Sequence, residues 1–144
     1  MNGNHLLIDT NILIYSETND EKEKHDMVIL ALERIKTQGD ILTISIQNIN
    51  EFSNNMIKKS KLSDSSINEI ITSYQSTFSL IFFNLETIRE ANRISRATGI
   101  HFYDALLTAT MHENGIDTII TENEKDFQKI PWLKVINPFK NEIK

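Results

Sequence analysis

The residues best suited to chemistry in this sequence are acids that stand beside apolar segments. Asp9 follows directly on the apolar residues 6–8, and Asp104 lies within the otherwise apolar segment 102–107. Glu51 lies in a polar helical stripe, and Asp126 follows two further acids after an apolar run. A carboxylate that faces a protein core is unfavourable unless it is paired or binds a metal. The pattern therefore predicts a carboxylate cluster, with the ordinary roles of helix cap, first-turn acid and exposed polar residue as the alternatives.

A cluster of this kind predicts a divalent metal site. Mg²⁺ and Mn²⁺ are hard cations that prefer carboxylate oxygens. Such ions bind a phosphate, lower the pKa of a water molecule and stabilise a leaving oxygen. Without metal the acids repel one another, which raises their pKa values. The fourth member of the set stays open among Glu122, Asn123, Glu124 and Asp126.

Short apolar strands alternate with helical segments along the chain. We expect strands at residues 5–8, 41–44, 79–83, 118–121 and 134–136. We expect helices at residues 11–15, 25–37, 45–59, 65–77, 84–99 and 102–114, and a helical turn around Asp126. In the second helix the apolar positions close to helical spacing are Met27, Leu30, Ala31 and Ile35.

This alternation predicts an α/β fold with a parallel sheet between helical layers. Functional sites in such sheets lie beyond the carboxyl ends of the strands. The residues that follow the expected strands are therefore the most informative ones, namely Asp9, Ser45, Asn84 and Thr121.

Composition narrows the class of protein. The 144 residues suit one domain, 40 % of them are hydrophobic, and the net charge of −5 argues against a simple nucleic-acid-binding module. The absence of cysteine excludes disulfides and thiolate metal sites. Because no signal-peptide pattern or membrane-length apolar run occurs, we expect a cytoplasmic protein that does not enter a membrane.

Four segments carry a resemblance to a known family. They are Leu-Ile-Asp-Thr-Asn-Ile-Leu at 7–13, Asn-Glu-Phe at 50–52, Tyr-Asp-Ala-Leu-Leu-Thr-Ala at 103–109, and Ile-Ile-Thr at 119–121 with Asn123 and Asp126-Phe127 after it. In this order they resemble the motifs of PIN-domain nucleases, in particular the VapC-type toxins of toxin–antitoxin pairs. The match spans nearly the whole chain.

The resemblance implies a three-layer α/β/α PIN-like domain over residues 1–144, with a central, mainly parallel sheet. It implies Mg²⁺- or Mn²⁺-dependent hydrolysis of RNA phosphodiester bonds. It further implies a homodimer and a small antitoxin whose tail fills the acidic groove.

The resemblance also implies roles for individual residues. Asp9, Glu51 and Asp104 would bind metal or orient the attacking water. Asp126 would stand at the variable fourth position, with Asn123 sharing its role. Asn11 and Thr121 would hold the acids in place.

RNA binding also needs cations, because phosphate contacts dominate affinity. Arg89, Arg93 and Arg96 share one face of the expected helix 84–99 and are the best candidates. Ordinary solvent-exposed charge is the alternative for each of them.

Three other functions compete with the nuclease interpretation. A phosphatase with a strand-end Asp nucleophile has a second Asp two residues later, where this chain has Asn11. A phospho-acceptor receiver domain needs a lysine near a late strand end, and residues 131–134 match that poorly. The third is a non-catalytic interaction domain, which the four acidic positions argue against.

Overall fold

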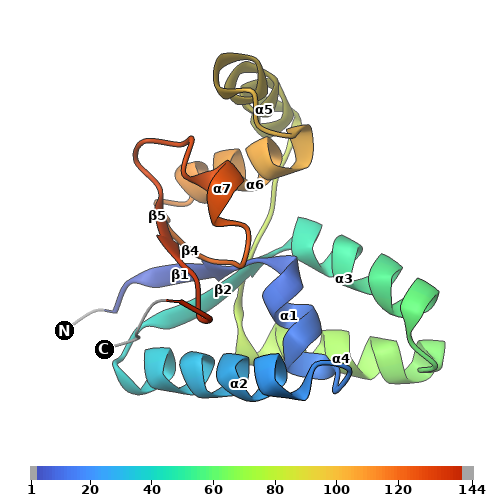
Figure 1. Ribbon diagram of the computed structural model, residues 1–144. Coiled ribbons are helices and arrows are strands. Elements are labelled where there is room, and N and C mark those ends of the chain that lie inside the picture. The colour runs from blue at the N-terminus through green and yellow to red at the C-terminus, as the bar shows by residue number, and fades with distance from the viewer. Residues whose placement is uncertain (1–2, 141–144) are drawn as a thin grey trace.

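The computed structural model describes residues 3–140 and has a five-stranded sheet at its centre (Figure 1). The strands are β1 (His5–Ile8), β2 (Ile41–Ser45), β3 (Ser79–Ile81), β4 (Thr118–Ile120) and β5 (Lys134–Ile136). Their order across the sheet is β3-β2-β1-β4-β5, and all four neighbouring pairs are parallel. The predicted three-layer α/β/α fold is confirmed.

Helices cover both faces of this sheet (Figure 1). They are α1 (Thr10–Glu17), α2 (Lys22–Thr37), α3 (Ile46–Lys59), α4 (Asp64–Thr77), α5 (Leu85–Thr98), α6 (Phe102–Glu113) and α7 (Glu124–Phe127). Buried residues of α1 to α4 form one hydrophobic core with the sheet. Buried residues of α5, α6 and α7 form a second core on the opposite face.

The apolar run that ends at Asp9 is explained by these two cores. Leu6 and Ile8 belong to the core under α1 to α4, whereas Leu7 belongs to the core under α5 to α7. Successive side chains of a strand point to opposite faces, so a strand between two helical layers is apolar at every position. Leu7 and Ile8 are fully buried, which fixes the end of β1 rigidly.

Helix α2 and strand β3 illustrate how the observed elements differ from the sequence prediction. Helix α2 begins three residues earlier than expected, at Lys22, and buries Val28, Ala31, Leu32 and Ile35. The predicted apolar positions Met27 and Leu30 are 38 % and 54 % exposed, because the helix turns a neighbouring face towards the sheet. Strand β3 ends at Ile81 rather than at residue 83, and Phe82 beyond it is exposed.

The strand order creates a reversal point beside β1. The chain runs from β1 to β2 and β3 on one side, and then returns to place β4 on the other side of β1. Parallel α/β sheets bind ligands at such a reversal, beyond the carboxyl ends of the strands. Asp9 and Thr121, the residues that follow β1 and β4, lie at this point. None of the helices within residues 3–140 is both long and apolar enough to cross a membrane.

Candidate active site

Asp9 is held by residues from two neighbouring strand ends. It is the N-cap of α1, and its Oδ1 accepts a hydrogen bond from the Thr10 backbone N–H at 2.8 Å. Its Oδ2 accepts from Thr121 Oγ1 at 2.7 Å and from Asn11 Nδ2 at 3.3 Å. Asp9 is only 9 % exposed, so these contacts orient a buried carboxylate. Asn11 and Thr121 thus contact the acid that they were predicted to hold.

Glu51 reaches the same place through Thr10. The Thr10 hydroxyl donates to Glu51 Oε1 at 2.6 Å and accepts from Asn48 Nδ2 at 3.0 Å. Asn48 is fully buried, and its Oδ1 accepts from the backbone N–H of Ser45, the N-cap of α3. Asn48 and Glu51 are three residues apart on one face of α3. The cap of this helix therefore sets the position of Glu51 relative to Asp9.

Asp104 and Asp126 approach from the other helical layer. Asp104 is in the first turn of α6, Asp126 is in α7, and both are half-buried. Burial raises the pKa of Asp104, and the charges of Asp126 and Glu51 raise it further, although His101 acts in the opposite direction.

The pKa of Asp9 responds to the same group of charges. Burial raises it from the ordinary value of 3.8 to about 6, against the lowering effect of the hydrogen bonds from Thr121 and Thr10. The charges of Asp104 and Glu51 add to the increase. The tertiary structure therefore places Asp9 within range of the charges of Glu51 and Asp104, and Asp104 within range of the charge of Asp126.

The donor set suits a hard divalent cation, because every charged group in it is a carboxylate oxygen. Burial and then repulsion by neighbouring acids raise the pKa of Asp9 and of Asp104, and a bound cation offsets both by favouring the ionised carboxylates. Within residues 3–140, however, no three acidic or histidine side chains stand close enough to form a ready-made metal site. Because Mg²⁺ usually keeps several of its waters, one or two of these carboxylates are enough to hold it together with a substrate phosphate.

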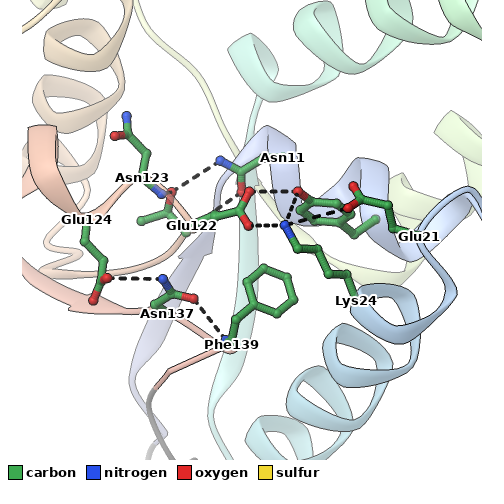
Figure 2. A network of polar contacts seen from close by, with 10 residues as sticks. Asn11, Glu21, Lys24, Glu122, Asn123, Glu124, Asn137 and Phe139 are labelled. Carbon is green, nitrogen blue, oxygen red and sulfur yellow. Dashed lines mark hydrogen bonds and ion pairs between the residues drawn. The ribbon is translucent and has the colours of Figure 1, made fainter.

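Glu122 and Glu124, the rival candidates for the fourth acid, have cationic partners of their own, and Figure 2 shows the contact between Glu122 and Lys24. Glu122 accepts hydrogen bonds from Lys24 Nζ at 2.6 Å and from Tyr15 Oη at 2.7 Å. Burial acts to raise the pKa of Glu122, but these two contacts outweigh it and lower the pKa. Glu124 pairs with Lys140 Nζ at 3.1 Å, and this contact lowers its pKa as well.

The contacts of Glu122 also anchor the loop after β4. The Glu122 backbone N–H donates to Asn11 Oδ1 at 3.4 Å, while Asn11 Nδ2 approaches Thr121 Oγ1 at 3.4 Å (Figure 2). The Asn123 backbone N–H donates to Thr121 Oγ1 at 2.9 Å. In Figure 2 the Asn123 side chain extends away from the contact between Lys24 and Glu122. Lys24 therefore secures, through Glu122, the loop that supplies Thr121 to Asp9.

The three arginines are not joined to the acids. Arg89 pairs with Glu86, and Arg93 Nε pairs with Glu90 at 2.8 Å, each within the exposed face of α5. Arg96 is also exposed on this helix. In the part of the chain that the structure describes, no hydrogen bond or ion pair links these arginines to the four acids.

Sequence reasoning missed several residues that shape the site. In the sequence, Thr10 stands out only as part of the first motif and Asn48 only as a polar neighbour of Glu51, yet both are buried and hydrogen-bonded. The position of Asn48 three residues after Ser45, as in a capping box, was an available signal. Lys24 gave no signal, because its partner Glu122 is 98 residues away in the sequence.

The geometry is unfavourable to two competing functions. Asn11, which stands where a phosphatase has its second Asp, donates its amide to Asp9 Oδ2 and adds no carboxylate. Lys134 is the first residue of β5 and pairs with Asp117, the residue before β4, at 3.6 Å. It therefore lies at the amino edge of the parallel sheet, opposite the edge where a receiver domain needs its lysine.

Comparisons with known proteins agree with this architecture. Residues 6–133 match the PIN domain family. A comparison by sequence with curated proteins gave no match.

Similar solved structures include a toxin–antitoxin complex from Klebsiella pneumoniae, with 25 % identity, a TM-score of 0.67 and coverage of 96 % of this chain and 99 % of that chain. Another is VapBC-1 from Haemophilus influenzae, with 19 % identity, a TM-score of 0.72 and coverage of 94 % and 99 %. A third is a sarcin–ricin loop cleaving toxin of Mycobacterium tuberculosis, with 14 % identity, a TM-score of 0.67 and coverage of 92 % and 99 %. The family match over most of the chain confirms the predicted resemblance, and the chain belongs to the PIN domain family.

Proposed function

We propose that this protein is a metal-dependent endoribonuclease that uses Mg²⁺ or Mn²⁺ held by Asp9, Glu51, Asp104 and Asp126. The observation that supports this proposal most is that the charges of Asp104 and Glu51 reach the buried Asp9 where the strand order reverses, and the pKa of Asp9 is raised to about 6. Buried acids that repel one another cost stability, and a cation-dependent function explains why a protein would keep them.

A divalent cation bound at this site supplies Lewis-acid stabilisation of a phosphate and lowers the pKa of a water molecule. The protein's own groups prepare the site. Thr121 and Asn11 hold Asp9 Oδ2, so that Asp9 presents its carboxylate in one orientation. Thr10 holds Glu51 Oε1, which leaves Oε2 to orient water or a cation. Asp104 of α6 and Asp126 of α7 contribute the remaining two carboxylates from the opposite face of the sheet.

RNA is the proposed substrate. A similar structure is that of a sarcin–ricin loop cleaving toxin, and its fold is shared by this chain. Arg89, Arg93 and Arg96 form the exposed basic row that we propose contacts RNA phosphates beyond the cut. A cytoplasmic location is the natural consequence of a role in cutting cellular RNA.

We further propose that the protein is the toxin of a toxin–antitoxin pair, acting as a homodimer and silenced by a small antitoxin. The support is that similar structures are a toxin–antitoxin complex and a VapBC complex. Induced expression of the chain should arrest growth, and co-expression of a small protein encoded beside it should restore growth. Growth arrest that persists in the Asp104→Asn variant would contradict a nuclease toxin. Sedimentation equilibrium measures the oligomeric state directly.

The first test of the nuclease proposal is metal binding. Calorimetric titration with Mn²⁺ should show binding to the parent protein and a large loss of binding in Asp104→Asn. Glu124→Gln is the matched control, because Lys140 already pairs with that acid. The same three proteins are then incubated with total RNA and Mn²⁺, and cleavage should follow the order of metal binding. Equal binding or equal cleavage by the parent and Asp104→Asn would reject the assignment in favour of a non-catalytic interaction domain.

A further inference from the structure

A pocket of about 410 Å³ opens between α3 and α6, beside the acidic site. Its wall includes Gln47, Asn50, Glu51 and Asn54 from α3, and Tyr103 from α6. Its volume is within the roughly 300–1,000 Å³ that is typical of small-ligand sites. Because Glu51 belongs both to the pocket and to the acidic cluster, a ligand at the acids adjoins this pocket.

The apolar side of the pocket is aromatic. Tyr103 immediately precedes Asp104 and is 55 % exposed, so its ring is accessible to a ligand. Its ring stacks against His101, with centroids 5.9 Å apart and an angle of 26° between the planes. Phe83, which follows β3, also lines the pocket. A planar ring supported from the side in this way suits stacking of a flat ligand.

The polar side of the pocket consists of amides. Gln47 is 5 % exposed, and its Nε2 donates to the Tyr103 backbone carbonyl at 2.8 Å. Its Oε1 accepts no hydrogen bond from any residue within 3–140. A buried acceptor without a donor is unfavourable, and because this oxygen is closed to solvent, the Gln47 side chain must turn towards the pocket to accept from a ligand N–H or O–H group. Asn50 and Asn54 add exposed amides that both donate and accept.

We infer that the pocket formed by Gln47, Asn50, Glu51, Asn54, Phe83 and Tyr103 holds one unpaired nucleobase of the RNA, next to the phosphate at the acidic site. A base combines a flat apolar face with an edge of N–H and acceptor groups, and the pocket offers one partner for each. Single-stranded RNA is recognised by stacking on aromatic side chains and by hydrogen bonds to base edges. This inference rests on the proposed nuclease function, because that function places RNA beside Glu51.

The inference makes two predictions about RNA binding. Base stacking depends on the Tyr103 ring, whereas the contact with Gln47 uses the Tyr103 backbone, so the ring can be removed without breaking that hydrogen bond. Tyr103→Ala should weaken binding of base-bearing RNA by roughly 5- to 150-fold. Tyr103→Phe keeps the ring and should restore the parent affinity. Trp132→Ala removes an exposed aromatic side chain that does not line the pocket and should change nothing.

Fluorescence anisotropy with labelled ribo-oligonucleotides tests these expectations in the presence of Mn²⁺. The probes are hexamers of A, C, G and U, and one hexamer that carries an abasic nucleotide at every position, with probe integrity checked by denaturing electrophoresis. The parent should bind at least one base-bearing hexamer more tightly than the abasic one, and Tyr103→Ala should abolish this difference. Gln47→Leu should reduce the parent's preference among the four base-bearing hexamers.

The outcomes separate this inference from the proposed function. If the parent binds base-bearing and abasic RNA equally, or if Tyr103→Ala keeps the parent's affinity for every probe, the nucleobase pocket is overturned. Cleavage of the same hexamers that continues unchanged in Tyr103→Ala would then leave the nuclease proposal standing alone. Base-dependent binding through Tyr103 by a parent that cuts no RNA would support the pocket and reject the nuclease.

Discussion

Replacing the Asp9 carboxylate with an amide is expected to stabilise the metal-free protein. Burial and neighbouring acids raise the pKa of Asp9 from 3.8 to about 6, so the folded state holds the proton more tightly than the unfolded chain does. The ionised form therefore opposes folding. The stability that this group contributes falls as the pH rises from about 4 to about 6, and it stays low above that range.

The size of the effect follows from the two pKa values. At 1.36 kcal/mol per pH unit, the difference between 3.8 and about 6 corresponds to about 3 kcal/mol at pH 8. In Asp9→Asn, the new amide nitrogen can donate to Thr121 Oγ1, but it loses the bond that Oδ2 accepts from Asn11. That loss costs about 1 kcal/mol. The net gain is about 2 kcal/mol, or a rise in Tm of roughly 4–8 °C for a chain of this size.

Thermal unfolding followed by circular dichroism measures this gain. The parent and Asp9→Asn are compared in EDTA at pH 8 and at pH 4, with the exposed Asp20→Asn as the control. At pH 8 the Asp9→Asn variant should be the more stable protein. At pH 4 its advantage should disappear, because Asp9 is then protonated in the folded parent.

Mn²⁺ should reverse the order of stability at pH 8. A ligand at a hundredfold excess over its Kd stabilises the binding-competent fold by about 2.7 kcal/mol, and only the parent has the full set of acids. A difference between the parent and Asp9→Asn that is the same at pH 8 and pH 4 would refute the reasoning, since it would mean that charge burial at Asp9 does not affect stability.

Three further perturbations test the arrangement around the acids. Asp126→Asn should weaken Mn²⁺ binding in calorimetry by at least tenfold. Glu122→Gln should leave Mn²⁺ binding nearly unchanged, because Lys24 and Tyr15 already engage Glu122. Equal losses of binding in the two variants would contradict the assignment of Asp126 rather than Glu122 to the metal site. Thr10→Val should lower the free energy of unfolding in urea by about 1–3 kcal/mol, because it leaves the buried Asn48 amide without its acceptor. A change below roughly 0.5 kcal/mol, which is the usual effect of an exposed substitution, would show that this contact is dispensable. Arg96→Gln should reduce RNA affinity uniformly across sequences and lower the slope of log affinity against log salt concentration by about 0.7; an unchanged slope would remove Arg96 from the RNA surface.

Most of the local structure could be predicted from the sequence. The boundaries of β1, β2, α3 and α6 lie within one or two residues of their predicted ends. Apolar periodicity, helix caps such as Ser45 and the apolar run before Asp9 are local signals, and local hydrogen bonds and burial enforce them. The family resemblance likewise needed only the order of short motifs.

Local signals failed where a helix had two comparable apolar faces. In α2, Met27 and Leu30 fit a helical stripe as well as Val28 and Leu32 do, and only packing against the sheet decided between them. Periodicity gives the existence of an apolar face, but the rotation of the helix about its axis depends on what it packs against.

Which polar residues contact one another depends on the tertiary fold. Strand order places Thr121 against Asp9 across 112 positions of sequence, and it joins Lys24 to Glu122 across 98. Because Lys24 pairs with Glu122, the pKa of Glu122 is lowered. The acids whose charges raise the pKa of Asp104 are Asp126 and Glu51 instead. Contacts of this kind depend on how distant segments pack together, so they cannot be predicted from the periodicity of either segment.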